Sequence, residues 1–159
     1  MEAKKGFDKT VNYRKLFKSY QRNLNKELRH LSRGAGKDYK WKGYIDPIPQ
    51  LFELLINILV SETTPTATRV RIIVALSYLL TPVDVIPEEV YGLEGYIDDF
   101  SVLILTLNSI KNNFSKRIIR KNWNGKSDII EFIETSVEKT PLFLNKNVLR
   151  EFKRIFDPE

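Results

Sequence analysis

The sequence contains no cysteine and a single histidine among its 159 residues. Without cysteine, disulfides, thiolate metal sites and cysteine nucleophiles are all excluded, and the absence fits a reducing compartment. The histidine, His30, forms one Glu-x-x-His pair with Glu27, whereas di-iron helical bundles need that pair twice. We therefore interpret His30 as an exposed helix residue, expect no cofactor, and exclude histidine-dependent phosphohydrolases and triads.

Long apolar runs are missing as well. The longest uncharged, mainly apolar stretches are residues 72–83 and 100–110, with twelve and eleven residues. A helix that crosses a membrane needs roughly 20, so we expect no transmembrane span. The first ten residues, MEAKKGFDKT, have no apolar segment of the signal-peptide type. We expect a cytoplasmic protein and leave peripheral attachment to a membrane open.

Charge is spread unevenly along the chain. Residues 1–42 hold thirteen Lys or Arg against four Asp or Glu, and the remainder holds thirteen against sixteen. The net charge of +6 is therefore +9 in the first quarter and −3 in the rest. Such asymmetry bears on the choice of partner and not on the fold.

The spacing of apolar residues predicts an all-α protein, because no segment alternates in the manner of a β-strand. We expect a single domain over residues 1–159, a compact bundle of six or seven helices with a central helix-turn-helix hairpin. The expected helices cover residues 11–33, 47–62, 65–80, 98–113 and 115–123 (the last prolonging its predecessor or standing alone), then one from Ser127-Asp128 and one beginning between Asn145 and Asn147. Residues 47–62, apolar almost all round, should lie at the centre, packed with 65–80 and 98–113.

The first expected helix has one apolar stripe, spaced by three and four residues, which Leu16 widens. Its members are Tyr13, Phe17, Tyr20, Leu24, Leu28 and Leu31. Lysines and arginines occupy the rest of the surface, and a basic and aromatic linker, residues 37–46, follows. Two interpretations of residues 1–42 stay open: the helix packs on the body through this stripe, or it extends as a basic arm.

Two Xaa-Pro pairs are typical of helix starts. Asp46 precedes Pro47, and Thr64 precedes Pro65. Asp and Thr can accept hydrogen bonds from the free amides of a first turn, and proline at the first helical position loses no hydrogen bond. We therefore predict that Asp46 and Thr64 cap the second and third helices.

The segment between the third and fourth helices is acidic, with six carboxylates and no Lys or Arg within residues 84–99. Local chemistry accounts for most of them, because caps and first-turn positions favour carboxylates by roughly 0.5–2 kcal/mol each. The residues to which we assign this structural role are Thr81, Pro82, Asp84, Pro87, Gly95, Asp98 and Asp99, with Asp98 capping the next helix. Two alternatives stay open: an acidic surface that binds protein, and a site for a hard cation formed by Asp84, Asp98 and Asp99.

The same stretch resembles a known family. The helix ending ALSYLLT, then PVDVIPE and GYIDD, is similar to the YkvA-like domain of unknown function over about residues 70–110. The matching positions are Pro82, Asp84, Pro87, Gly95, Tyr96, Asp98 and Asp99, while Glu88 replaces the usual Asp. The resemblance implies a helical-hairpin module found mostly in bacteria and archaea, sometimes near membranes. It implies no reaction, so it informs the fold and not the function.

Because the sequence contains no complete set of catalytic residues, it favours a non-enzymatic interaction or regulatory module whose partner is a protein. Nucleic acid and an anionic membrane surface are alternative partners, and a metal-dependent enzyme using the acidic turn is an alternative function. The predicted partner-binding residues are Arg22, Lys26, Arg29, Arg33, Lys40, Trp41 and Lys42. A second basic and aromatic segment surrounds Trp123, and Asp128, Glu131, Glu134 and Glu138 are spaced as a solvated acidic helix face.

Overall fold

The computed structural model describes residues 12–32, 42–80 and 96–158 of the chain. Within these ranges it is all-α, without strands, as the sequence predicts. The longer helices are α2 (Tyr13–Ser32), α4 (Ile48–Val60), α5 (Thr66–Leu80), α7 (Tyr96–Asn113), α8 (Lys116–Asn122), α9 (Ile129–Lys139) and α10 (Lys146–Phe156), joined by the single turn α3 (Lys42–Ile45) and a 3-10 turn, η3 (Thr140–Leu142). The expected linker at 37–46 thus includes one helical turn.

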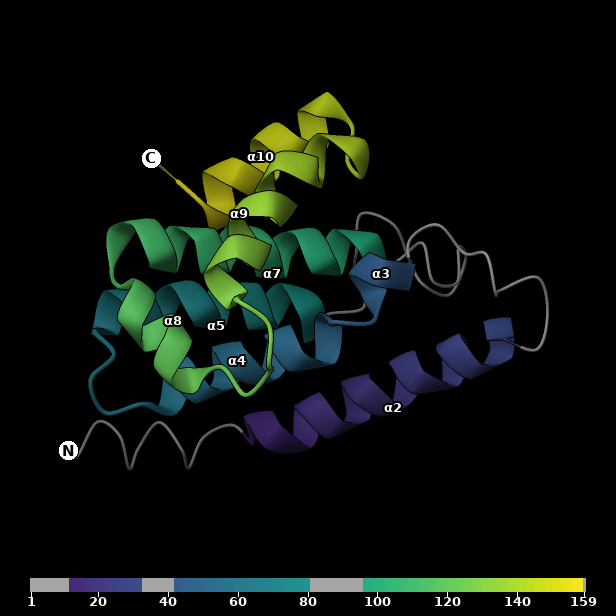
Figure 1. Cartoon of the computed structure of the whole chain (residues 1–159), viewed down its shortest axis with the longest axis horizontal. Helices are drawn as coiled ribbons and strands as arrows, with labels where there is room; N and C mark the ends of the chain where they lie inside the picture. Colours follow the sequence, from purple (N-terminus) through teal and green to yellow (C-terminus); the bar gives the residue numbers. More distant parts are fainter. Residues whose placement is uncertain (1–11, 33–41, 81–95, 159) are drawn as a thin grey trace.

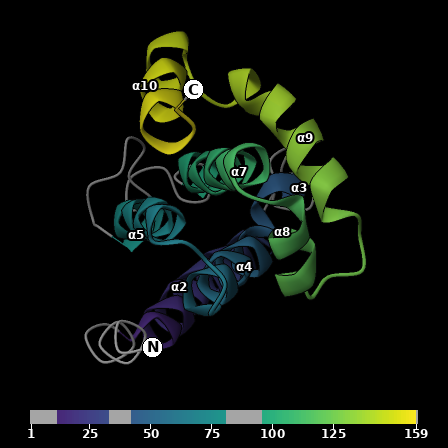
Figure 2. The same ribbon diagram turned by 90° about the vertical axis from the view of Figure 1, so that its left-hand side faces the viewer.

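Helix α7 is the centre of the bundle. Every residue from Tyr96 to Ile110 is buried, and α3, α4, α5, α8, α9 and α10 all pack against this helix. Figure 2, which looks along α7, shows the other helices arranged around it. The prediction that residues 47–62 lie at the centre with 65–80 and 98–113 agrees with the structure, because α4 buries most of its length and packs against α5 and α7. The buried part of α7 contains six polar residues, so the apolar pattern of the sequence does not show how completely this helix is enclosed.

Helix α2 packs on the body through part of its predicted apolar stripe. The rings of Phe17 and Tyr20 lie 5.1 and 5.2 Å from that of Phe52 on α4, and Leu24 is fully buried. Leu16, by contrast, is 38% exposed and does not widen the buried stripe. Figure 1 shows α2 running beside α4, with its later half extending past the end of that helix.

Both predicted proline-associated caps differ from the structure. Helix α4 begins at Ile48 with Pro47 as its N-cap residue, and Asp46 instead pairs with Lys42 at 2.6 Å. The short helix α3 causes this, because it places Lys42 and Asp46 one turn apart. Thr64 donates its hydroxyl hydrogen to the carbonyl oxygen of Ile58 at 2.6 Å, so it closes α4 and does not open α5.

Three later helix starts carry side-chain caps. Ser115 accepts hydrogen bonds from two amides of α8, Asp128 accepts two from α9, and Asn145 accepts one from Val148 in α10. Residues 116–122 therefore form a helix of their own, and the predicted starts at Asp128 and Asn145 are confirmed. None of the helices in the described parts of the chain combines the length and apolar character that crossing a bilayer requires.

Candidate functional site: a basic helix face and a buried aspartate pair

The exposed face of α2 carries a continuous stripe of cations. Its members are Lys15, Lys18, Arg22, Lys26 and Arg29, all exposed and separated by steps of three, four, four and three residues. That spacing places them on one side of the helix over about 21 Å of its length. Phe17, Tyr20 and Leu24 occupy the opposite side, so packing on α4 directs the cations toward solvent. We call these five residues the α2 basic stripe.

No carboxylate interrupts this stripe in its first half. Residues 12–26 contain no Asp or Glu. Among the described residues, Lys15, Lys18, Arg22 and Lys26 form no ion pair. Like charges one turn apart on a helix repel by about 0.2–0.5 kcal/mol per pair. The stripe therefore costs the isolated fold some stability, which binding of an anionic surface would offset.

The aromatic residues near these basic segments are committed to packing. Tyr44 stacks among Phe100 and Phe143, with ring centroids 5.6 and 4.7 Å away. The indole N–H of Trp123 donates to the carbonyl oxygen of Ser127 at 3.1 Å, and the ring covers Gly125 so closely that a Cβ there has no room. The rings of Tyr44 and Trp123 are therefore packed within the protein and do not offer exposed faces on which bases could stack.

Of the remaining predicted partner-binding residues, Lys42 is exposed on α3 and engaged with Asp46. Helix α3 packs on α7, whereas α2 packs on α4. Lys42 therefore belongs to a different element from the α2 basic stripe. Arg33, Lys40 and Trp41 lie outside the described residues.

The start of α7 contains two fully buried carboxylates, Asp98 and Asp99, both 0% exposed. The phenol of Tyr20, from α2, donates to Oδ2 of Asp99 at 2.5 Å. The phenol of Tyr78, from α5, donates to Oδ2 of Asp98 at 2.9 Å. The backbone N–H of Asp99 donates to Oδ1 of Asp98 at 3.0 Å. Adjacent carboxylates thus hold two different helices against the centre of the bundle.

The family of proteins of unknown function designated DUF1232 matches residues 68–105. The chain contains a DUF1232 domain. The resemblance to the YkvA-like family is thereby confirmed, with slightly earlier bounds than the expected 70–110. The domain consists of α5 and the first half of α7 within the described residues, so it includes Tyr78 and the aspartate pair.

The matches to known relatives cover very different shares of this chain. The uncharacterized protein ORF9 of Methanothermobacter thermautotrophicus is 25% identical over 95 residues, or 60% of this chain and 65% of that protein. The E3 ubiquitin-protein ligases RNF170 of Xenopus tropicalis and Danio rerio are 54% and 51% identical over 43 and 41 residues. Those matches span 24% and 23% of this chain but only 17% and 15% of the ligases. No solved structure matches.

The double aspartate of the DUF1232 domain occupies a different position in its helix from the predicted one. Helix α7 begins at Tyr96, so Asp98 stands in the first turn and is not the cap. A first-turn carboxylate is still favoured by the helix dipole, but its main contacts are tertiary. Tyr78 also stacks edge-on with Phe152 and Phe156, at 5.5 and 5.6 Å, which connects the pair to α10.

The other predicted turn residues, Thr81, Pro82, Asp84, Pro87 and Gly95, lie outside the described residues. The proposed convergence of Asp84 with Asp98 and Asp99 therefore stays a prediction. Within the described ranges, no three His, Asp or Glu side chains are grouped to hold a metal ion. Sequence reasoning missed Tyr20 and Tyr78 as partners of the aspartates, because neither is adjacent to them in the chain and no local spacing signals the contact.

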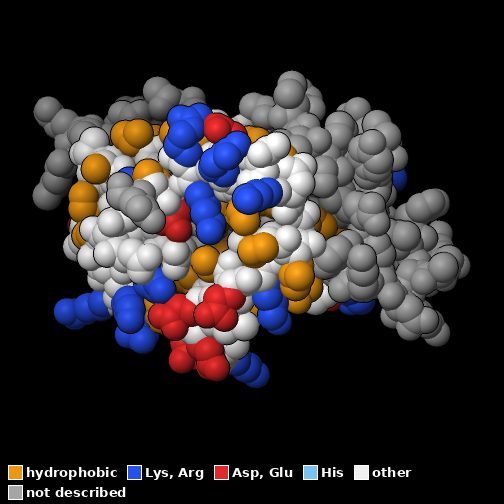
Figure 3. All heavy atoms as spheres, turned by 90° about the horizontal axis from the view of Figure 1, so that it is seen from above, with side chains coloured by type: hydrophobic (Ala, Val, Ile, Leu, Met, Phe, Trp, Pro, Cys, Tyr) orange, Lys and Arg blue, Asp and Glu red, His pale blue; other side chains and the backbone are white. Residues whose placement is uncertain are grey.

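A separate acidic face lies on α9, where Figure 3 shows carboxylates gathered at one edge of the molecule. Glu131, Glu134 and Glu138 are exposed, and Glu134 pairs with Lys111 of α7 at 3.2 Å. Asp128 is occupied as the cap of α9. The interpretation of these residues as a solvated helix face agrees with their exposure.

Proposed function

We propose that this protein is a non-enzymatic helical interaction module that binds an acidic surface of a protein partner through the α2 basic stripe. The observation that carries this proposal is the unbroken row of exposed cations opposite the buried face of α2. Charge of one sign along a rigid helix attracts a surface of the opposite sign and sets its orientation.

The burial of the two described carboxylates of the acidic segment, Asp98 and Asp99, supports an interaction role over catalysis. Asp98 and Asp99 are fully buried, and their described hydrogen bonds come from Tyr78, Tyr20 and the backbone. A catalytic carboxylate must reach a substrate or a bound cation. These two instead hold helices together, and within the described residues the exposed cations of α2 form a separate surface that is available to a partner.

The occupied aromatic rings favour protein over single-stranded nucleic acid. Base stacking on exposed rings contributes roughly 1–3 kcal/mol per base to such binding. Phe17 and Tyr20 of α2 face α4, and Tyr44 and Trp123 are packed. Among the described residues, cations whose neighbouring rings are already packed suit a carboxylate-rich partner.

The relatives support a modular role. The match to the RNF170 ligase of Xenopus tropicalis covers 17% of that protein, and the match to ORF9 covers 65% of it. A similarity confined to a small part of a larger ligase is consistent with a module that places a host protein beside a partner.

The decisive experiment reverses three charges of the stripe. We compare Lys18→Glu/Arg22→Glu/Lys26→Glu with a control of equal charge change on the exposed face of α10, Lys146→Glu/Arg150→Glu/Lys153→Glu. Both variants and the starting protein are titrated, at physiological ionic strength, with a polyglutamate peptide, with single- and double-stranded oligonucleotides of matched charge, and with anionic vesicles.

We expect the peptide to bind the starting protein and the α10 variant. Its affinity for the α2 variant should fall at least about tenfold, because three glutamates would repel the peptide carboxylates that the cations attract within a Debye length of about 8 Å. Equal losses in both variants contradict a site on α2. Tighter binding of an oligonucleotide or a vesicle than of the peptide rejects a protein partner in favour of that ligand.

A further inference from the structure

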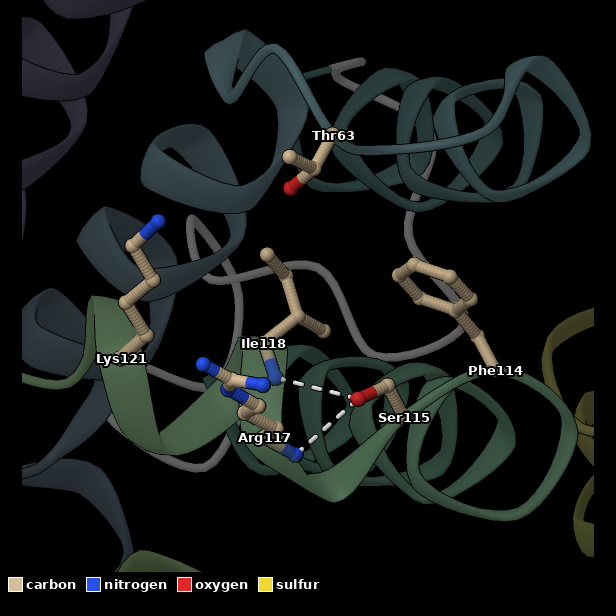
Figure 4. Close-up of a pocket in the computed structure, with 6 residues that line it drawn as sticks. All are labelled: Thr63, Phe114, Ser115, Arg117, Ile118 and Lys121. Atoms are coloured by element: carbon tan, nitrogen blue, oxygen red, sulfur yellow. Dashed lines mark hydrogen bonds between the residues drawn. The ribbon is translucent and has the colours of Figure 1, made fainter.

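A pocket of about 400 Å³ lies between the α4–α5 connection and α8, away from the DUF1232 aspartate pair. It is lined by Thr63, Phe114, Ser115, Arg117, Ile118 and Lys121 (Figure 4). Sites for small molecules in proteins measure roughly 300–1,000 Å³. The volume therefore suits a ligand the size of one substituted ring.

The lining joins apolar and cationic chemistry in one place. In Figure 4, Ile118 points into the pocket toward Thr63, and the ring of Phe114 closes one end. Arg117 and Lys121 lie on the side away from that ring. Phe114 is 37% exposed, so a large apolar surface remains available to a ligand. Such a site offers a planar apolar wall together with two positive charges.

The cations of α8 are placed against local electrostatics. Lys116 and Arg117 occupy its first turn, where no acid is present, although a helix N-terminus favours negative charge. Arg117 and Lys121 are also like charges one turn apart. Neither forms an ion pair with any described carboxylate. An anion in the pocket would relieve both unfavourable interactions.

The binding groups are the side chains and not the end of the helix. Ser115 Oγ already accepts hydrogen bonds from the amides of Arg117 and Ile118, at 3.1 and 3.3 Å. An anion must therefore be bound by the guanidinium and ammonium groups, which form the strongest class of charge-assisted hydrogen bonds with carboxylate and phosphate.

We propose that this pocket binds a small amphipathic anion, a carboxylate or phosphate joined to one apolar ring. The anionic group lies against Arg117 and Lys121, the ring lies against Phe114 and Ile118, and the Thr63 hydroxyl is a further polar contact. This proposal does not rest on the α2 basic stripe, because no residue of that stripe lines the pocket.

The test uses the full chain and four matched probes: phenyl phosphate, benzoate, inorganic phosphate and phenol. Titration calorimetry gives each affinity, and chemical-shift changes of backbone amides locate each site. We expect at least one of the two amphipathic anions to bind at least about tenfold more tightly than inorganic phosphate, which lacks the ring contact, or phenol, which lacks the charge-assisted hydrogen bonds, since either contribution corresponds to about that factor. Shifts should centre on residues 114–121 and Thr63.

The variants separate the pocket from general surface charge. Arg117→Gln/Lys121→Gln should lose at least about tenfold in affinity for the bound anion. The control, Lys116→Gln/Arg120→Gln, has the same charge change on the same helix but lies off the pocket, so it should keep its affinity. Phe114→Ala should weaken binding of the amphipathic anions and leave that of inorganic phosphate unchanged.

Three results overturn the proposal: no binding of either amphipathic anion, equal losses in both double variants, or an affinity of both amphipathic anions no higher than that of inorganic phosphate or phenol. The α2 charge-reversal variant should bind these probes like the starting protein. A failure of the polyglutamate experiment is thereby distinguishable from a failure here.

Discussion

The phenol of Tyr20 donates a hydrogen bond to Oδ2 of Asp99 at 2.5 Å, across 79 positions of the sequence. The contact joins a helix outside the DUF1232 segment to the double aspartate within it. Both groups are buried, Tyr20 at 8% exposure and Asp99 at 0%. The basic face of α2 is therefore oriented by a carboxylate that the family segment contributes.

Replacing Tyr20 by Phe should destabilise the fold by about 1–3 kcal/mol, because it removes one hydrogen bond to a buried carboxyl group and preserves the ring packing on Phe52. Urea unfolding measures the loss. A double-mutant cycle with Asp99→Asn should give an interaction energy of about 0.5 kcal/mol or more. Additive effects of the two changes would show that the contact contributes nothing.

Two aspartates in different surroundings should respond very differently to truncation. Asp98→Ala removes the acceptor of both the Tyr78 phenol and the Asp99 amide, and we expect a loss of about 2–4 kcal/mol, since each stranded buried donor costs about 1–3 kcal/mol. Asp46→Ala breaks only an exposed ion pair with Lys42 and should cost less than about 1 kcal/mol. Similar losses in thermal unfolding would refute the structural role of Asp98.

The cap of α9 provides an independent test on the C-terminal half of the chain. Asp128→Ala should lower the free energy of unfolding by about 0.5–2 kcal/mol, because Oδ1 accepts the amides of Ile130 and Glu131. Glu138→Ala, an exposed carboxylate of the same helix, should change it by less than about 0.5 kcal/mol. Chemical denaturation of the two variants side by side decides the comparison.

Two glycines should give opposite results when changed to alanine. A Cβ at Gly125 meets the ring of Trp123, so Gly125→Ala should destabilise by about 1–3 kcal/mol and alter tryptophan fluorescence. A Cβ at Gly43 meets nothing within 4 Å, and this residue is helical in α3. Gly43→Ala should therefore be neutral or stabilising by about 0.5–1 kcal/mol. Destabilisation of equal size at both positions would contradict the packing of Trp123.

Divalent cations test the alternative role of the acidic turn. Because Asp98 and Asp99 are engaged by tyrosines, we expect thermal unfolding to be unchanged by millimolar Mg²⁺, Mn²⁺ or Ca²⁺. A site filled at a hundredfold excess over its Kd would instead stabilise the protein by about 2.7 kcal/mol. Stabilisation that disappears in Asp98→Asn would establish a cation site and revive the metal-dependent function.

Local signals were sufficient for much of the helical pattern. Asp128 and Asn145 are typical caps, and the structure begins α9 and α10 directly after them. The same reasoning was wrong at Asp46 and Thr64, where a helical turn upstream and a carbonyl of the preceding helix compete for the side chains. A residue that can cap a helix can also form hydrogen bonds or ion pairs with other groups. The local sequence does not show which of these groups lies within reach.

The sequence by itself determined that the chain is helical, that α2 has an apolar side and a basic side, and that residues around the double aspartate belong to a known family. These properties follow from helical periodicity and from residue order. Only the tertiary structure decided that α7 is the central helix, that Tyr20 and Tyr78 engage the aspartates, and that Arg117 and Lys121 share a pocket with Phe114. The physical reason is that burial, and contacts between residues distant in the chain, depend on how helices pack against one another, which no local spacing encodes.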